Sequence, residues 1–355
     1  MALDIKWVEQ NLYSSKDFYT DYNSTFILND ARYDINRYYE IIRDYLELMK
    51  YISEKHPDFF RNPKGHPYYW IGFFLFKIKY YEQAIFYLDA ALAEDKKCMP
   101  EFTKKENGNI TYGWRNSGAA LFFKLYKFPD NHPFAFFNFP ELKDKVKKII
   151  EDFNSNNKET YQIDIETDFV GKFIYEILKT GNTAVATALY SFIMEKSDID
   201  DMIKLKSDNG GTIEPMILHL LKGSVLFESL VKIEYYDKAK QDLINEEARK
   251  KGISPINVDA DKFYVTLSNI FFNNDFKSKM GYTNNIKSNA SDINEIIVTI
   301  NKFSIVDSFT CTAKLRNTSA HNLCWDSRFI SNYSGLYNHI IYSILYYIYN
   351  QYVKP

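Results

Sequence analysis

Apolar side chains recur at intervals of three and four residues along much of the chain, which predicts a protein built mainly of helices. Near the N-terminus this stripe includes Tyr38, Ile42, Tyr45 and Ile52. It ends at His56-Pro57, because a proline disfavours helical backbone at the residue before it. The chain shows neither a strand–helix–strand alternation nor a convincing ladder of strands, so the sequence predicts an all-α fold.

Residues 65–97 have the pattern of two antiparallel helices and resemble one tetratricopeptide-type (TPR-like) hairpin. The large and small packing positions of such a repeat correspond to Tyr68, Ile71, Gly72, Leu75, Tyr81, Ala84, Leu88 and Ala91. The small residues Gly72 and Ala84 would let the two helices approach closely. Residues 111–128 resemble a degenerate neighbouring unit. One unit is equally consistent with a generic helical hairpin, because a stable solenoid needs about three repeats.

A polar, Asn-rich stretch at residues 151–158 is the best candidate for a linker between domains. We therefore expect a TPR-like helical domain at residues 1–155, which would bind a partner or regulate, and a second helical domain at residues 160–355. The helices expected in the second domain cover residues 166–179, 183–195, 212–235 (with Thr212 as N-cap), 292–308 and the tyrosine-rich C-terminus. The polar residues 240–289 between them are expected to form a long, partly mobile insertion.

The composition is that of a globular protein, with 46% hydrophobic, 25% charged and 17% aromatic residues. Only 10 Pro and 13 Gly occur, which favours long helices. A net charge of -2 gives no global attraction to nucleic acid, so an RNA substrate would need a local basic patch or groove. Three cysteines without metal-ligand spacing and the lack of a signal-peptide pattern predict a reduced, cytoplasmic protein. We expect no metal and no cofactor.

Residues 329–353 carry no Asp, Glu, Lys or Arg and are long enough to span a bilayer. Polar residues interrupt this segment, however, and its densely apolar part is only Ile340 to Tyr349. A run of that length is more often a buried core or interface helix. We therefore expect no membrane span.

The most suggestive set of reactive side chains is Arg316-Asn317-Thr318-Ser319-Ala320-His321. A histidine can both accept and donate a proton near neutral pH, and an arginine offers a planar cationic fork suited to a phosphate. Asn317 and His321 are four residues apart, so they would lie on one face of a helix, while the small Ser319 leaves room for a phosphate to approach. The same spacing recurs at Arg61-Asn62-Pro63-Lys64-Gly65-His66, where two prolines nearby and a glycine predict a loop instead.

The copy at Arg316 to His321 resembles the R-x4-6-H signature of the HEPN superfamily, in its common form Arg-Asn-x3-His. In that superfamily the motif lies near the start of the last long helix, as we expect here. The segment 221–232 resembles the earlier helix of such domains, which often carries an acidic or polar residue that faces the motif. On this segment Glu228 shares a face with Ile217 and Leu221, where a carboxylate would need a partner such as Arg316. A solvated charge at the edge of the helix is the slightly favoured alternative.

The resemblance, which covers roughly residues 160–355, implies a HEPN-like helical bundle with metal-independent endoribonuclease activity. Its products would be a 2′,3′-cyclic phosphate and a 5′-hydroxyl, in a defence, toxin or stress response. It gives His321 the role of general acid or base, Arg316 that of binding the scissile phosphate, and Asn317 that of orienting either. It also implies a homodimer, whose interface would include the charge-free final helix.

The N-terminal domain would then bind a protein or a small-molecule regulator. Two alternatives remain at this point. One is a non-catalytic scaffold with an inactive HEPN-like dimerisation domain, and the other is a structural helical protein that carries the motif by chance. His219, His339, Cys311 and Cys324 are expected to be core residues rather than catalytic ones.

Overall fold

The computed structural model describes residues 3–27, 34–123, 139–161, 169–180, 183–205, 212–289, 293–302, 304–321 and 327–353. These residues form 16 α-helices, several single turns of 3-10 or π-helix and one two-stranded hairpin, which confirms the all-α prediction. Contacts divide the chain into two compact units. Unit 1 comprises Met1–Lys145 and Val170–Met194, and unit 2 comprises Val146–Phe169 and Glu195–Pro355.

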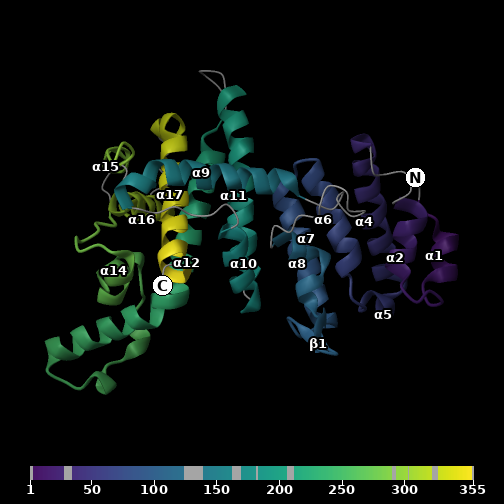
Figure 1. Ribbon diagram of the computed structural model, residues 1–355, viewed down its shortest axis with the longest axis horizontal. Coiled ribbons are helices and arrows are strands. Elements are labelled where there is room, and N and C mark those ends of the chain that lie inside the picture. Colours follow the sequence, from purple (N-terminus) through teal and green to yellow (C-terminus); the bar gives the residue numbers. More distant parts are fainter. Residues whose placement is uncertain are drawn as a thin grey trace. The chain divides into compact units, whose positions relative to one another are not determined.

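The elements of unit 1 are short helices around a central helical hairpin (Figure 1). They are α1 (Ile5–Asn11), α2 (Phe18–Tyr22), η1 (Asn23–Ile27), η2 (Ile35–Arg37), α4 (Tyr38–Lys55), α5 (Pro57–Phe60), α6 (Gly65–Lys77), α7 (Tyr81–Cys98), β1 (Lys104–Glu106), β2 (Asn109–Tyr112), η3 (Trp114–Asn116), α8 (Gly118–Phe123) and α10 (Phe169–Lys179). The expected end of the long N-terminal helix is correct, because α4 stops one residue before His56.

Helices α6 and α7 form the hairpin expected at residues 65–97, and they approach each other closely at Gly72. A Cβ atom built on Gly72 would lie 2.9 Å from the carbonyl oxygen of Ala84 and 2.8 Å from Leu88 Cγ. Helix α6 is buried on all sides along its second half, since every residue from Trp70 to Phe76 is buried. The hairpin is therefore the centre of unit 1, and its kinship to a tetratricopeptide repeat stays a prediction.

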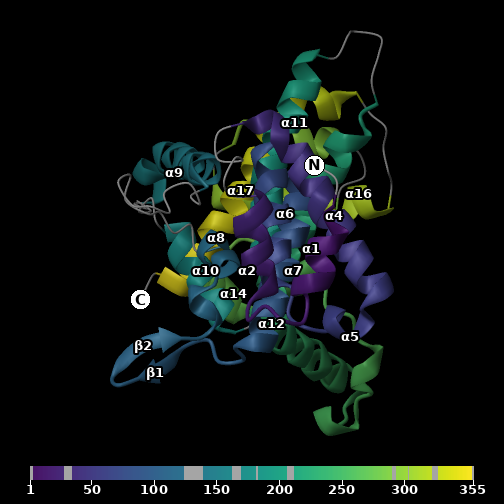
Figure 2. The same cartoon turned by 90° about the vertical axis from the view of Figure 1, so that its right-hand side faces the viewer.

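A β-hairpin follows α7, where the sequence suggested a second helical unit from residue 111 (Figure 2). Its strands β1 and β2 pair antiparallel around Asn107 and Gly108, both of which have positive φ angles of 51° and 82°. An Asn-Gly pair is the strongest sequence signal for such a turn, because both central residues must adopt left-handed backbone. The expected absence of strands is thus wrong at this one place, and residues 124–128 lie outside the described part.

The expected linker at residues 151–158 is helical, because it lies inside α9 (Pro140–Tyr161). The partition between the units falls within α9 and within α11 (Thr183–Leu205) rather than at a loop. Phe153 and Asn157 are both buried, so this stretch packs one side against the protein in spite of its polar composition. The predicted domains 1–155 and 160–355 therefore differ from the observed units, in which α10 belongs to unit 1.

Unit 2 is organised around three long helices that pack side by side, α12, α16 and α17 (Figure 1). Its elements are α12 (Glu214–Lys251), η5 (Pro255–Asn257), η6 (Ala260–Lys262), α13 (Leu267–Phe272), α14 (Asn274–Met280), α15 (Asn294–Ile297), α16 (Ile305–His321), α17 (Arg328–Ile348) and η7 (Tyr349–Val353). Helix α12 extends 16 residues beyond the expected end at Tyr235, and Thr212 accepts a hydrogen bond from Glu214 N although Ile213 is the N-cap.

An aromatic stack fills the core of unit 2. The ring of Phe309 is stacked against Phe227 at 5.3 Å and against Phe271 at 5.8 Å. Phe276 completes the group, with its ring 5.9 Å from that of Phe309. Phe271 and Phe276 come from residues 240–289, which we expected to form an insertion. That expectation is wrong for this part, because these two phenylalanines are core residues that hold α13 and α14 in unit 2.

Helix α17 is covered by its own unit along most of its length, since nearly every residue from Leu336 to Ile348 is buried. Tyr342 and Tyr346 donate hydrogen bonds to carbonyl oxygens of Asp152 and Met280, and His219 stacks on Tyr337 at 5.9 Å. This helix is therefore a core helix and leaves little surface for a dimer interface. In the described part of the chain, no helix combines the length and the apolarity that crossing a membrane requires.

Candidate functional site

The motif from Arg316 to His321 occupies the last turns of α16, not the start of the final helix. The expected helix at residues 292–308 is instead broken into α15 and the beginning of α16. Ser304 explains the restart, because its hydroxyl accepts a hydrogen bond from Asp307 N at 3.0 Å and so caps α16. The C-terminal end of a helix carries partial negative charge, which suits the cationic Arg316.

Glu228 is buried and paired, so the slightly favoured solvated alternative is wrong. Arg316 Nε donates to Glu228 Oε2 at 2.5 Å, and Lys232 Nζ lies 2.7 Å from Oε1. The Glu228 side chain is only 7% exposed, whereas those of Arg316 and Lys232 are 29% and 32% exposed. One buried carboxylate thus holds two cations that both reach solvent, which leaves this end of α16 with a local positive charge.

Asn317 is used for structure, because its Nδ2 donates to the Ser288 carbonyl oxygen at 2.8 Å and lies 3.2 Å from Asn289 Oδ1. These bonds tie residues 288–289 to α16 beside the arginine. The side chains of Ser319 and His321 lie outside the described part of the structure. The backbone of α16 nonetheless continues through His321, one turn after Asn317.

The other histidines of unit 2 are packed as expected. His339 Nε2 lies 3.2 Å from the carbonyl oxygen of Ile300, so Nε2 donates and Nδ1 accepts from Ser308 Oγ at 2.9 Å. Burial lowers the pKa of His339, which keeps the ring neutral in this arrangement. His219 lies 2.8 Å from the hydroxyl of Tyr333. Cys311 is also a core residue, because it is fully buried. Its burial raises the pKa of the thiol to about 12.

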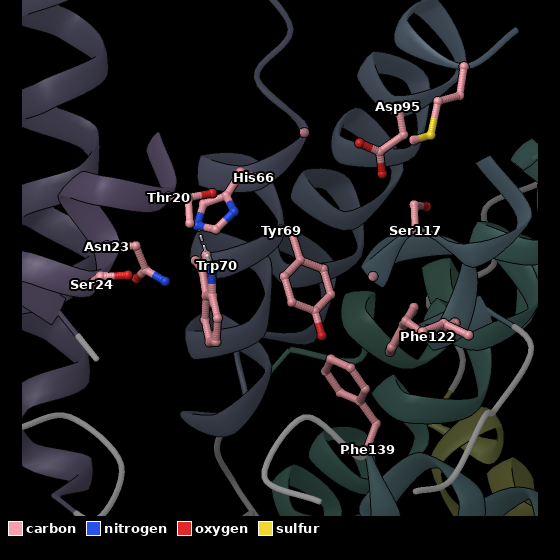
Figure 3. Close-up of a pocket in the computed structure, with 14 residues that line it drawn as sticks. Thr20, Asn23, Ser24, His66, Tyr69, Trp70, Asp95, Ser117, Phe122 and Phe139 are labelled. Atoms are coloured by element: carbon pink, nitrogen blue, oxygen red, sulfur yellow. Dashed lines mark hydrogen bonds between the residues drawn. The ribbon is translucent and has the colours of Figure 1, made fainter. Parts of the chain in front are cut away.

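Unit 1 contains a cavity that sequence reasoning did not predict, which we call the unit 1 cavity. Its volume is about 470 Å³, and it opens between the start of α6, the end of α7, α8 and the turn after α2 (Figure 3). Its lining residues are Thr20, Asn23, Ser24, Gly65, His66, Tyr69, Trp70, Asp95, Met99, Ser117, Gly118, Leu121, Phe122 and Phe139. A cavity of this size, mainly apolar with a few polar groups, is typical of small-molecule sites.

His66 in this cavity belongs to the copy of the motif that we dismissed as a loop. It lies instead in the first turn of α6, where Trp70 Nε1 donates to its Nε2 at 3.0 Å. Burial lowers the pKa of His66 to about 4, so the ring is neutral at pH 7 and carries its proton on Nδ1. Figure 3 shows this second nitrogen turned away from Trp70, on the side of Tyr69. His66 thus offers the cavity a hydrogen-bond donor.

Asp95 is the acidic group of the unit 1 cavity. A Cβ atom on Gly65 would lie 2.0 Å from Asp95 Oδ1, so the carboxylate lies directly against the backbone at the start of α6. Burial raises the pKa of Asp95 to about 6, a hydrogen bond from Ser117 opposes this rise, and the charge of Glu94 adds to it. The position of Asp95 could have been predicted from the sequence. It continues the stripe Ala84, Leu88 and Ala91, so it lies on the face of α7 that packs against α6.

Neither site gathers metal ligands. Within the described ranges, no group of three or more His, Cys, Asp or Glu side chains comes together as a metal ion would require. Comparison with known proteins adds no family: no family model, curated protein or solved structure matches this chain.

Proposed function

We propose that unit 2 is a metal-independent endoribonuclease of HEPN type, with Arg316 and His321 as its catalytic pair and Asn317 as a positioning residue. The observation that carries this proposal is the ion pair between Arg316 and the buried Glu228. The resemblance predicted an acidic residue from an earlier helix opposite the motif, and Glu228 occupies that position. The proposal keeps its expected setting in a defence, toxin or stress response.

The ion pair supports phosphate binding because Glu228 contacts the Nε side of the Arg316 guanidinium and not its terminal nitrogens. Among the described residues, Glu228 takes the Nε edge, and Nη1 makes a long contact of 3.5 Å with Asn317 Oδ1. The terminal nitrogens can therefore approach a phosphate while the carboxylate fixes the plane of the group. Lys232 adds a second cation within reach of the same carboxylate. This local pair of cations supplies a positive charge that the net charge of -2 does not provide.

The chemistry assigned to these residues is transfer of a phosphodiester onto its own ribose. The 2′-oxygen attacks phosphorus as it loses its proton, and the bond to the 5′-oxygen breaks as that oxygen gains one. The products are the 2′,3′-cyclic phosphate and the 5′-hydroxyl. His321 moves one of these protons, and Arg316 stabilises the charge on the phosphorane.

A second imidazole is needed for the other proton, and a second copy of the chain can supply it. Helix α12 carries Leu218, Val225 and Ile233, which are 48%, 43% and 45% exposed despite being apolar. At 100° per residue these three lie within about 80° of one another, and Glu228 lies about 60° from Val225. A dimer that covers this stripe, which we call the α12 stripe, would bring the two motifs close together. It replaces the covered helix α17 as the proposed interface.

The decisive experiment is cleavage of tRNA and of unstructured RNA by the purified full-length protein in EDTA. We expect cyclic-phosphate products from the wild type and a loss of about 10²–10⁴-fold in both His321→Ala and Arg316→Ala. Arg61→Ala is the matched control, because it removes the arginine of the copy with the same spacing. Arg61 is exposed, and we expect full activity from this variant.

Circular dichroism of each variant shows whether the helices remain. Cleavage that persists in both motif variants would refute the site. Cleavage that depends on a divalent metal ion would refute the mechanism. An inactive scaffold, the alternative reading, predicts no cleavage by any of the four proteins.

A further inference from the structure

We propose that the unit 1 cavity binds a planar aromatic molecule that carries a protonated amino or amidino group, with Asp95 as the counter-ion. This inference rests on unit 1 alone and does not depend on the nuclease activity proposed for unit 2. It gives a ligand class to the regulator expected at the N-terminal part of the chain.

Two neighbouring carboxylates at the end of α7 show why Asp95 calls for a cation. Glu94 is buried beside Lys64, whose Nζ lies 3.3 Å away and whose backbone N–H donates at 3.1 Å, and Lys97 Nζ lies 2.5 Å away. Asp95 has a hydroxyl partner, Ser117, but no Lys or Arg forms an ion pair with it among the described residues. A carboxylate removed from water needs a partner charge, and here the cavity lies open beside it.

The walls of the cavity favour a flat ring system. Trp70, Tyr69, Phe122 and Phe139 contribute four aromatic side chains, and the rings of Phe122 and Phe139 meet edge to face at 4.5 Å. Aromatic faces attract both other rings and cations, and the attraction to a cation grows when water is excluded. Figure 3 shows these rings on the side of the cavity below Asp95, so an aromatic amine can satisfy both at once.

The remaining polar groups favour a cation over an anion. His66 is neutral at pH 7 and presents one N–H, so it adds no positive charge for an anion to use. Asn23 Oδ1 accepts a hydrogen bond from the hydroxyl of Tyr45 at 2.8 Å, and the amide nitrogen of Asn23 is turned toward Trp70 (Figure 3). These donors are suited to a ring nitrogen or a carbonyl oxygen at the far end of the ligand. Among the described residues that line the cavity, Asp95 is therefore the one that carries a full charge.

Three indoles of the same shape test the charge preference without any mutation. Tryptamine carries an ammonium group, tryptophol a hydroxyl and indole-3-acetate a carboxylate. Calorimetric titration of the full-length protein at pH 7.5 should give tryptamine a dissociation constant of about 1 mM or tighter, as a ligand of about twelve non-hydrogen atoms allows. We expect tryptophol to bind at least about tenfold more weakly, and indole-3-acetate to bind most weakly of all.

Two variants place the binding in this cavity. Asp95→Asn should abolish the preference for tryptamine over tryptophol, whereas Asp58→Asn, an exposed acid of the same unit, should leave it unchanged. Ser24→Trp introduces a bulky ring at an exposed lining position and should weaken all three ligands at least about tenfold. If Asp95→Asn failed to fold, titration of the wild type with the three indoles, together with Ser24→Trp, would still test the proposal.

Several results would overturn the proposal. One is that the wild-type protein shows no binding at tryptamine concentrations several times the expected dissociation constant. Another is that tryptophol binds as well as tryptamine, or that indole-3-acetate is the preferred ligand. The last is that Ser24→Trp leaves binding unchanged.

Discussion

Arg316 Nε lies 2.5 Å from Glu228 Oε2, which joins residues that are 88 positions apart in the sequence. The bond connects the last turns of α16 to the middle of α12, and Lys232 binds the other oxygen of the same carboxylate. Of the three charges only Glu228 is deeply buried. Its negative charge is what allows two cations to stay close together at the motif.

Replacing Glu228 with Gln should therefore affect both stability and activity. The side chain keeps its shape but leaves two cations without their counter-charge, which we expect to lower the free energy of unfolding by about 1–3 kcal/mol. Cleavage of RNA should fall about tenfold or more, because the guanidinium is no longer held in one plane. Urea denaturation and the EDTA cleavage assay measure the two effects.

Glu246→Gln is the matched control for this variant. Glu246 lies on the same helix and pairs with Lys250 four residues later, but the pair is exposed to solvent. We expect no measurable change in unfolding or in cleavage, since exposed pairs contribute little. Equal effects in the two variants would mean that the buried pair has no special role.

The α12 stripe gives a separate prediction about assembly. Val225→Asp places a charge at its centre, which should convert the proposed dimer to a monomer in analytical ultracentrifugation and reduce cleavage by at least about tenfold. Ile256→Asp is the control, because Ile256 is 89% exposed and lies in η5, away from the stripe. A wild type that is monomeric at assay concentration yet active would contradict the two-copy mechanism.

The fold class and the helical hairpin of unit 1 could be predicted because they depend on local spacing. The stripe Ala84, Leu88 and Ala91 faces α6, and Gly72 is where the helices approach, both as the pattern indicated. The domain boundary could not be predicted, because a polar Asn-rich stretch reads as a linker unless one knows that Phe153 and Asn157 pack inside the protein.

The candidate sites divide in the same way. The partnership of Glu228 with Arg316 was one of two alternatives that the sequence left open, since a carboxylate on an apolar stripe needs a cation, but a solvated charge was the slightly favoured one. The unit 1 cavity was not, because Asn23, His66, Asp95 and Phe139 come from segments far apart in the sequence. The helical position of His66 was also missed, because Gly65 and Pro67 suggest a loop. In the structure Pro67 lies within the first turn of α6, where a proline fits without the loss of a hydrogen bond.

Gly72→Ala tests the close approach of α6 and α7. Alanine normally stabilises the interior of a helix relative to glycine. Here the new methyl group would lie 2.9 Å from the Ala84 carbonyl oxygen and 3.1 Å from the Leu88 nitrogen, both backbone atoms that cannot give way separately. We expect a loss of about 1–3 kcal/mol in unfolding free energy. Gln83→Ala, at an exposed position of α7, should change stability little, and a Gly72→Ala protein as stable as the wild type would contradict the packing.

Asp95→Asn should make the ligand-free protein more stable at neutral pH, which is the opposite of what a structural acid would do. The pKa of Asp95 is raised from 3.8 to about 6 in the folded protein, chiefly by burial. A raised carboxyl pKa means that the folded state binds the proton more tightly. Ionisation of Asp95 therefore lowers the free energy of unfolding. This loss is present in full above about pH 6 and disappears as pH falls below 3.8.

We expect Asp95→Asn to gain about 1–3 kcal/mol in unfolding free energy at pH 7.5, with a smaller gain at pH 5. The charge of Glu94, the nearest other acid, adds to the cost of ionised Asp95, so the substitution removes that repulsion as well. Denaturant unfolding at the two pH values measures the gain. A variant less stable than the wild type at pH 7.5 would show that Asp95 holds the fold together. The expected gain in unfolding free energy would instead show that the Asp95 carboxylate lowers the stability of unit 1, as is typical of a group that is kept for binding.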